Sequence, residues 1–188
     1  MKKWIAGFLA VFLITAPALA MEVGGVSVPE QVKLNGQEIN LNGAGIRTKF
    51  FFDIYAGALY LPKVARDAKK AISMQGAKRV SMHFIHSEVS KGKLVDGWES
   101  GFKKNLSKEA REKLQERLGQ FNDMFSDVKS GDVVLLDYLP EQGTRVTVRG
   151  DIKGTIPGKD FNEALLAVWL GKKPADKDLK ESMLSGEN

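Results

Sequence analysis

The alternation of hydrophobic and polar residues indicates antiparallel β-sheet soon after residue 20. The predicted strands cover residues 22–28, 31–34, 37–41 and 50–61. Asn35 and Gly36 separate two of these strands, and an Asn-Gly pair favours a tight hairpin turn because both positions accept a positive φ. A second such pair, Asn42-Gly43, precedes the segment that leads into the longest strand. The folded chain is therefore expected to open with a series of antiparallel strands.

Apolar residues spaced three and four apart predict two consecutive helices in the middle of the chain. Ser90 and Ser107 stand where N-caps are expected, since a serine hydroxyl can accept a hydrogen bond from the first helical turn. Further helices are predicted over residues 64–74, 164–170 and 174–184, and further strands over residues 79–86, 132–139, 144–149 and 152–156. Strands on both sides of a central helix pair indicate an α+β fold, with the helices packed on the sheet.

The composition is that of one ordinary globular domain. The chain has 188 residues, of which 43% are hydrophobic and 27% are charged, which suits one compact core better than two. It contains no cysteine, and this excludes disulfides, thiolate nucleophiles and cysteine-ligated metal sites.

The beginning of the chain has the three parts of a secretory signal peptide. A basic start precedes an apolar run over residues 4–16, and an Ala-Leu-Ala cleavage site follows at residues 18–20. An uncleaved membrane anchor is the alternative, but the run is shorter than the roughly 20 residues that a bilayer requires. We therefore expect a signal peptide over residues 1–20, one domain over residues 21–188, a periplasmic or secreted protein, and no stable membrane span after cleavage.

The charge balance does not indicate nucleic acid as a partner. Loss of Lys2 and Lys3 with the signal peptide reduces 28 basic residues to 26, which against 23 acidic residues leaves a net charge of +3. This excess is too small and too scattered for a nucleic-acid surface. The sequence specifies no oligomeric state.

The two histidines do not form a metal site. His83 and His86 fall three residues apart on a predicted strand, so their side chains point to opposite faces of the sheet. A single histidine acting as a general base stays open. Gly43 and Gly45 suggest a phosphate loop only superficially, because no G-x-G-x-x-G or Walker sequence is present. We expect neither a metal nor a nucleotide cofactor.

Arg47 is the strongest candidate for binding chemistry. It precedes a markedly apolar strand that begins with three phenylalanines at residues 50–52. Its charge has to meet water, an internal carboxylate or an anionic ligand, because an unpaired buried charge costs several kcal/mol. Asp53 and Glu38 are the internal alternatives. A guanidinium beside a phenol would suit a carboxylate or an enolate oxygen.

Several segments, in their order along the chain, resemble the chalcone isomerase-like family. They are G-A-G-I-R at residues 43–47, Y-A-G-A-L-Y-L at residues 55–61, Trp98 and Phe102 on a mid-chain helix, and F-N-E-A-L-L-A-V-W-L-G at residues 161–171 with Pro174 beyond. The resemblance covers essentially the whole chain after residue 20. It implies an open-faced β-sandwich, in which a layer of helices covers a large antiparallel sheet and a ligand cleft lies between them.

The resemblance also implies a site. Plant members of the family cyclise chalcones to flavanones, and related members bind fatty acids, with an arginine and a tyrosine on the carboxylate. Arg47 matches the arginine of both groups and Tyr55 matches the tyrosine of the fatty-acid binders, so a catalytic or ligand-binding role is implied for both. The helix residues expected to contact the ligand are Trp98, Phe102, Val168 and Trp169. Packing in the core is the alternative for the aromatic ones.

The last apolar helix argues against an isomerase. The isomerases have threonine followed by methionine where this chain has Val168 and Trp169, and valine cannot donate a hydrogen bond. We therefore predict an exported protein that binds a small apolar acid resembling a fatty acid. One alternative is an intramolecular lyase of the chalcone isomerase type, in which Arg47 stabilises developing charge and Tyr55 or a water moves the proton. The other is a non-catalytic periplasmic accessory protein.

The separation of Arg47 and Tyr55 limits this hypothesis. On one straight strand their Cα atoms would lie about 26 Å apart, at ~3.3 Å per residue, too far to share a carboxylate. The chain must therefore fold back between them. Thr48-Lys49 is the only candidate for the turn, although neither residue favours turns, so the sequence leaves open whether the two side chains converge.

Overall fold

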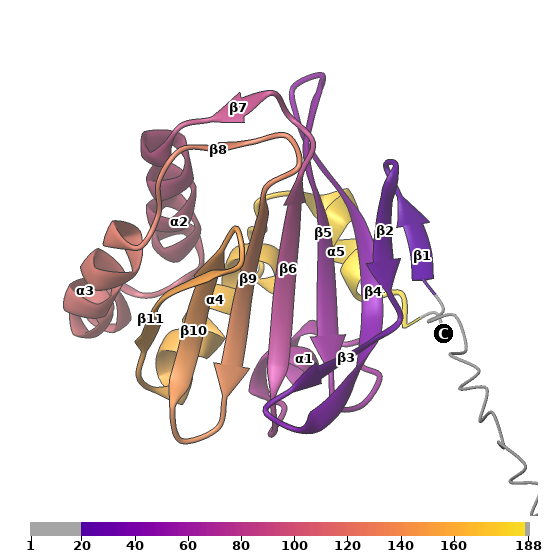
Figure 1. The fold of residues 1–188 in the computed structure, drawn as a ribbon. Helices are drawn as coiled ribbons and strands as arrows, with labels where there is room; N and C mark the ends of the chain where they lie inside the picture. The colour runs from indigo at the N-terminus through magenta and orange to yellow at the C-terminus, as the bar shows by residue number, and fades with distance from the viewer. Residues whose placement is uncertain (1–19, 187–188) are drawn as a thin grey trace, which may run out of the picture.

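The computed structural model describes residues 20–186, arranged as Figure 1 shows. The strands are β1 (Ala20–Val23), β2 (Val26–Pro29), β3 (Gln31–Leu34), β4 (Gln37–Lys49), β5 (Phe52–Leu61), β6 (Lys78–Phe84), β7 (Glu88–Val89), β8 (Val128–Lys129), β9 (Val133–Leu139), β10 (Gly143–Val148) and β11 (Asp151–Ile156). The helices are α1 (Ala68–Ser73), α2 (Lys91–Asn105), α3 (Lys108–Asp123), α4 (Lys159–Leu170) and α5 (Lys177–Met183). The predicted signal peptide lies outside the described residues, apart from Ala20. None of the described helices is both long and apolar enough to cross a membrane.

Seven strands form one antiparallel sheet, in the order β11-β10-β9-β6-β5-β4-β3. The β1–β2 hairpin is a separate sheet, and β7 pairs only with β8. In Figure 1 α1, α4 and α5 lie behind the large sheet, while α2 packs on α4 and α3 packs on α2. The predicted α+β fold, a large antiparallel sheet covered by a layer of helices, is confirmed.

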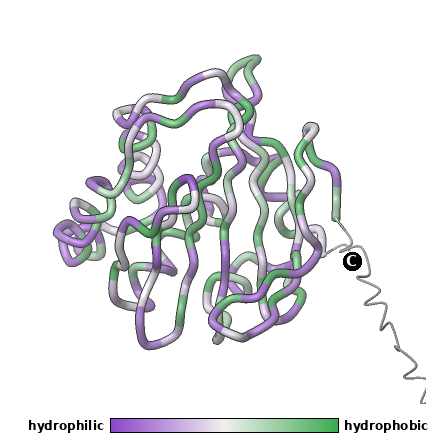
Figure 2. The backbone as a smooth tube through the Cα atoms, viewed as in Figure 1, coloured by the Kyte–Doolittle hydropathy of each residue, from purple (hydrophilic) through white to green (hydrophobic). Residues whose placement is uncertain are grey.

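Hydrophobic residues pack on both faces of the sheet, in two separate clusters. Successive strand residues point to opposite faces, so Leu59 packs toward the helices with Trp169 whereas Tyr60 packs on the other face with Val28 of the β1–β2 hairpin. The tube in Figure 2 shows hydrophobic positions recurring along the central strands. The hairpin is held there by Tyr60, whose hydroxyl donates a hydrogen bond to the Pro29 carbonyl oxygen at 2.9 Å.

Helix α5 packs directly on β4 because glycines lie beneath it. A Cβ atom on Gly43 would overlap the backbone oxygen of Ser182, and one on Gly45 would lie 2.6 Å from the Ser182 Cβ. Asn42, at an irregularity in the β4–β5 register, is buried and donates a hydrogen bond to the Met183 carbonyl oxygen at 2.8 Å. The glycine-rich segment is therefore part of strand β4, and its glycines allow α5 to pack closely against the strand.

The predicted elements differ from the observed ones mainly at their ends. The strand predicted over residues 22–28 is two strands, because Gly24 and Gly25 both adopt positive φ and turn the chain. Helix α1 begins later than predicted, after Asp67, whose side chain caps it. Helix α4 begins earlier than predicted, at Lys159, because Phe161 is the only apolar residue of the helix before Ala164 and its polar neighbours interrupt the apolar run.

Buried Lys78 gives the fold a dependence on pH. Its side chain is 1% exposed, and its Nζ donates a hydrogen bond to the Ile72 carbonyl oxygen at 2.7 Å. Burial, with Lys159 nearby, lowers the pKa of Lys78 from 10.5 to about 8. Between these two values the unfolded chain holds a proton that the folded chain has lost, so this group makes stability rise with pH across that window.

Replacing Lys78 with methionine is expected to raise the free energy of unfolding by about 2 kcal/mol at pH 7, because the folded state no longer holds a buried charge. The gain should disappear toward pH 10.5, where the lysine is neutral in the folded state and the unfolded chain also begins to lose its proton. Urea unfolding of both proteins at pH 7 and pH 10 measures this difference. An equal difference at the two pH values would show that burial of the charge is not its cause.

Candidate functional site

The β4–β5 hairpin brings Arg47 and Tyr55 side by side. The two residues are direct partners in the strand register, and the Arg47 Cζ atom lies 5.8 Å from the centre of the Tyr55 ring, which is the distance of a cation–π contact. The chain folds back at Phe50 and Phe51, not at the predicted Thr48-Lys49, which still belongs to β4. The turn lies beyond the predicted position because Phe50 adopts a φ of 59°, a left-handed conformation that is rare for a bulky side chain.

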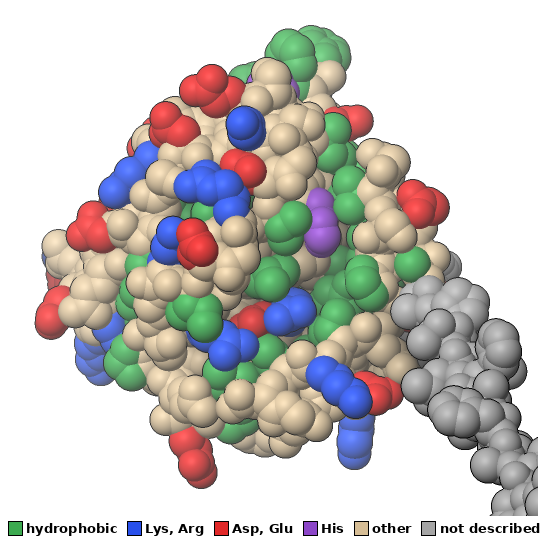
Figure 3. Space-filling model, in the orientation of Figure 1, with side chains coloured by type: hydrophobic (Ala, Val, Ile, Leu, Met, Phe, Trp, Pro, Cys, Tyr) green, Lys and Arg blue, Asp and Glu red, His purple; other side chains and the backbone are tan. Residues whose placement is uncertain are grey.

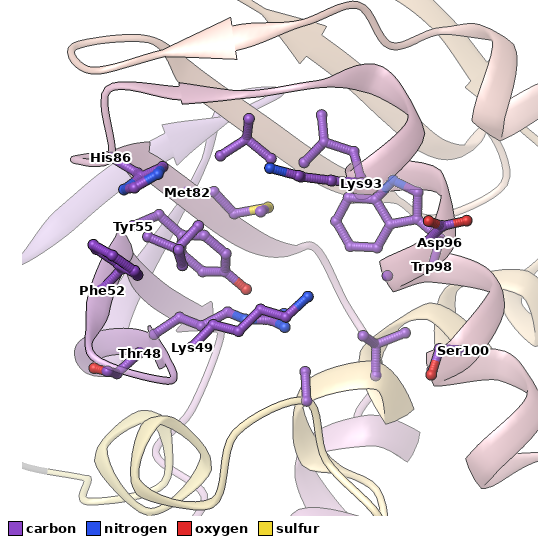
Figure 4. A pocket seen from close by; sticks show the side chains of 18 of the residues that line it. Thr48, Lys49, Phe52, Tyr55, Met82, His86, Lys93, Asp96, Trp98 and Ser100 are labelled. Carbon is purple, nitrogen blue, oxygen red and sulfur yellow. The ribbon is translucent and has the colours of Figure 1, made fainter.

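A cavity of about 700 Å³ lies between this hairpin and α2. In Figure 4 Tyr55 and Met82 stand on the strand side, and Trp98 and Lys93 face them from α2. Arg47 and, from α4, Val168 also line the cavity. The volume falls within the range of about 300–1,000 Å³ that is typical of small-molecule sites.

The cavity combines apolar walls with an excess of basic side chains. Its aliphatic, methionine and aromatic residues are Phe50, Phe52, Ile54, Tyr55, Met82, Phe84, Val89, Leu94, Trp98, Val168 and Ala175. Its charged residues are Arg47, Lys49, Lys93, Lys104 and Lys173 on the basic side, and Glu88 and Asp96 on the acidic side. Five basic residues against two acidic ones leave three positive charges in excess. Such a lining favours an apolar molecule that carries an anionic group.

Arg47 has no carboxylate partner in the part of the chain that the structure describes. Its Nε atom is buried and has no hydrogen-bond acceptor among these residues. Neither internal alternative is formed, since Asp53 accepts a hydrogen bond from the Thr48 hydroxyl at 3.0 Å and Glu38 is exposed near the opposite end of β4. The guanidinium is therefore available to an anion that enters the cavity.

Trp169 orients the Tyr55 hydroxyl. Both side chains are buried, and Trp169 Nε1 donates a hydrogen bond to the Tyr55 oxygen at 2.8 Å. An indole N–H can only donate, so the phenol accepts here and its own O–H proton stays available to another acceptor. Trp169 does not itself line the cavity. It acts on the site through Tyr55.

The remaining helix residues divide between the cavity and the core. Trp98 and Val168 line the cavity, and Phe102 does not. Phe102 is instead buried with its ring centre 5.7 Å from that of Phe161, so its place is in the core between α2 and α4. Trp98 Nε1 is buried with no acceptor among residues 20–186, and is a second unpaired donor on a residue of the cavity wall.

The histidines lie apart. His86 lines the cavity, with its ring centre 5.4 Å from that of Phe52. His83 is on β6 in register with Ala56, which packs on the opposite face of the sheet, and burial lowers the pKa of His83 below its usual value. Within the described residues no group of three or more histidine, aspartate or glutamate side chains could hold a metal ion.

Four lysines of the cavity, Lys49, Lys93, Lys104 and Lys173, were not among the predicted site residues. A signal for two of them exists in the sequence. Lys93 and Lys104 are eleven residues apart on α2, which is close to three helical turns, so they share one face of the helix beside the apolar stripe. The other two approach the cavity from the hairpin and from the segment after α4, and only the fold brings them there.

Comparison with known proteins identifies the class to which this fold and cavity belong. The family model described as chalcone isomerase-like matches residues 20–185. The chain therefore belongs to the chalcone isomerase-like family, as the sequence motifs predicted. A search among curated protein sequences found no match.

A solved structure shows the same fold. It is a fatty-acid binding protein of Arabidopsis thaliana, with a TM-score of 0.65 and 16% sequence identity. The alignment covers 85% of this chain and 92% of that chain. The similarity extends over nearly the whole plant protein, and at this identity it concerns the fold alone.

Proposed function

We propose that this protein is exported and binds a small apolar acid, such as a fatty acid, in the cavity between the β4–β5 hairpin and α2. In this proposal the carboxylate of the ligand pairs with the Arg47 guanidinium and accepts a hydrogen bond from the Tyr55 hydroxyl. The hydrocarbon part of the ligand lies along the apolar wall that includes Met82 and Trp98. Trp169 keeps the Tyr55 oxygen in position.

The unpaired state of Arg47 is the observation that carries this proposal. A guanidinium with a buried, unsatisfied N–H is costly unless an acceptor arrives. A carboxylate is the acceptor whose shape and charge match it best, because it can take two parallel hydrogen bonds. The excess of lysines around the cavity adds attraction for the same charge.

The apolar part of the cavity supports an elongated hydrocarbon rather than a sugar or a nucleotide. Val168 cannot donate a hydrogen bond to a ligand, and Phe84, Val89 and Leu94 are equally apolar. The Arabidopsis protein of similar fold is described as a fatty-acid binding protein, and this supports the same class of ligand here.

Export is proposed from the beginning of the chain. The basic start, the apolar run and the Ala-Leu-Ala site at residues 18–20 have the form of a signal peptide. The family match and β1 both begin at residue 20, next to the proposed cleavage site. Cleavage after Ala20 would thus leave the described strands and helices almost intact.

Native mass spectrometry of the protein purified from the periplasm of its own host tests both parts of the proposal. We expect the protein mass to be that of a chain whose first residue is Met21, and we expect a small acidic molecule to be retained in the complex. Gly97 lines the cavity, and a Cβ on it would meet no atom within 4 Å, so Gly97→Phe is expected to fill the site and to remove the retained molecule.

Gly119→Phe is the matched control, because Gly119 is also a helical glycine with open space around it and lies outside the cavity. This variant should keep the ligand. A wild-type protein that is isolated empty, and that takes up no palmitate when titrated, contradicts the binding proposal. A retained molecule that persists in Gly97→Phe would place the ligand elsewhere on the protein.

A further inference from the structure

The tip of the β4–β5 hairpin carries three consecutive exposed phenylalanines. Phe50, Phe51 and Phe52 are 83%, 97% and 58% exposed. Figure 3 shows a group of hydrophobic side chains that projects from the top of the molecule, where Figure 1 places the end of this hairpin. The other exposed large hydrophobic residues of the described chain, Val64 and Ile152, are isolated. The tip therefore exposes a concentrated apolar surface to water.

The backbone conformation of this tip is unfavourable for the residues that form it. Phe50 adopts a φ of 59°, and a bulky residue in the left-handed region is strained, whereas asparagine and glycine accept it readily. The β3–β4 hairpin of the same chain uses the favourable pair, Asn35 and Gly36, both with positive φ. Phenylalanine at the β4–β5 turn works against folding, and this indicates a role outside the fold.

We propose that this tip, residues 49–52, inserts into the surface of a lipid bilayer. A convex aromatic projection fits a soft apolar phase, whereas a docked protein segment needs a groove to receive it. Aromatic side chains are favoured at the membrane interface. Lys49, exposed beside the phenylalanines, supplies attraction for anionic headgroups.

The tip is continuous with the cavity. Phe50, Phe52 and Lys49 also line it, so insertion of the tip places this side of the cavity at the bilayer surface. This inference goes beyond the proposed function, because membrane binding through the tip requires no ligand in the cavity. The membrane-binding proposal and the ligand-binding proposal can therefore be disproved independently of each other.

A fluorescent label at the tip tests the insertion directly. The chain contains no cysteine, so Phe51→Cys can carry a single nitrobenzoxadiazole group, and Gln142→Cys serves as the matched control. Gln142 is exposed in the turn after β9, and β9 runs in the same direction as β5, so this turn lies at the opposite end of the sheet from the tip.

Both labelled proteins, ligand-free and expressed from the full-length sequence, are mixed with vesicles of phosphatidylcholine and phosphatidylglycerol in equal amounts. The label at position 51 should gain intensity and shift to shorter wavelength, while the label at position 142 should not change. Each label reports only its own surroundings, so binding through another part of the chain leaves the tip label in water. No change at position 51, or equal changes at both positions, would overturn the proposal.

The double variant Phe50→Gly/Phe51→Asn separates docking from folding. It puts glycine at position 50, the turn residue whose φ is positive, so the melting temperature should rise by a few degrees. Loss of two exposed aromatic side chains should lower partitioning onto the same vesicles by about tenfold or more. A variant that binds vesicles as well as the wild type contradicts the proposal, and so does one that loses stability, because the aromatic side chains would then serve the fold.

Discussion

Replacing Arg47 with glutamine is expected to weaken the binding of palmitate by about 10- to 100-fold, because a hydrogen bond to a charged group contributes about 1.5–3 kcal/mol. Arg47 has no other charged partner among the described residues, so little structure should be lost with the charge. Isothermal titration calorimetry of the wild type and the variant measures the difference.

Two controls make this result specific. Palmitate methyl ester cannot form the ion pair, so its affinity should be similar for the wild type and for Arg47→Gln. Arg111 also has a buried Nε without an acceptor, but it lies outside the cavity, so Arg111→Gln should bind palmitate as the wild type does. An equal loss of affinity for the acid and for the ester would mean that Arg47 shapes the cavity without recognising the carboxylate.

The sequence was most informative where local chemistry determines local structure. Asn35-Gly36 turns the β3–β4 hairpin as predicted, with both residues at positive φ. Ser90 and Ser107 cap α2 and α3, each by accepting a hydrogen bond from a backbone N–H of the first turn. These features depend on a few neighbouring residues, so they can be recognised without knowledge of the tertiary structure.

The hairpin that forms the site could not be derived in this way. No rule of turn chemistry would place a turn at Phe50 and Phe51, because aromatic residues rarely adopt positive φ. The convergence of Arg47 and Tyr55 depends on that turn, which is why the sequence left it open. Phe50, which breaks this local rule, also borders the cavity, as expected where function competes with folding.

Contacts between residues far apart in the chain also could not be predicted from sequence patterns. Val168 lines the cavity, but the role of its neighbour Trp169 depends on Tyr55, which is 114 positions away in the chain. Periodicity indicates that both belong to buried elements and says nothing about which donor meets which acceptor. Family resemblance supplied both Tyr55 and Trp169 as candidates, and the structure shows that Trp169 contacts the Tyr55 hydroxyl without lining the cavity.

The second large effect is expected at Gly43. Gly43→Ala should lower the free energy of unfolding by about 2–3 kcal/mol, because the added methyl group overlaps a backbone oxygen of α5 and backbone has little freedom to move aside. Urea denaturation measures the change. Gly119→Ala is the control, since that helical glycine has open space around it, and alanine there should stabilise α3 by about 0.5–1 kcal/mol.

Gly43→Ala should also affect ligand binding. Asp176, which caps α5, also accepts a hydrogen bond from the Thr48 backbone N–H at 3.0 Å, one residue from Arg47. If α5 is displaced from its packing position on Gly43, the hydrogen bond between Thr48 and Asp176 is strained. The β4–β5 hairpin is then held less firmly near Arg47. Gly43→Ala is therefore expected to weaken palmitate binding as well as stability, whereas Gly119→Ala should leave binding unchanged. Undiminished affinity in a destabilised Gly43→Ala protein would show that the hairpin holds Arg47 in place without help from α5.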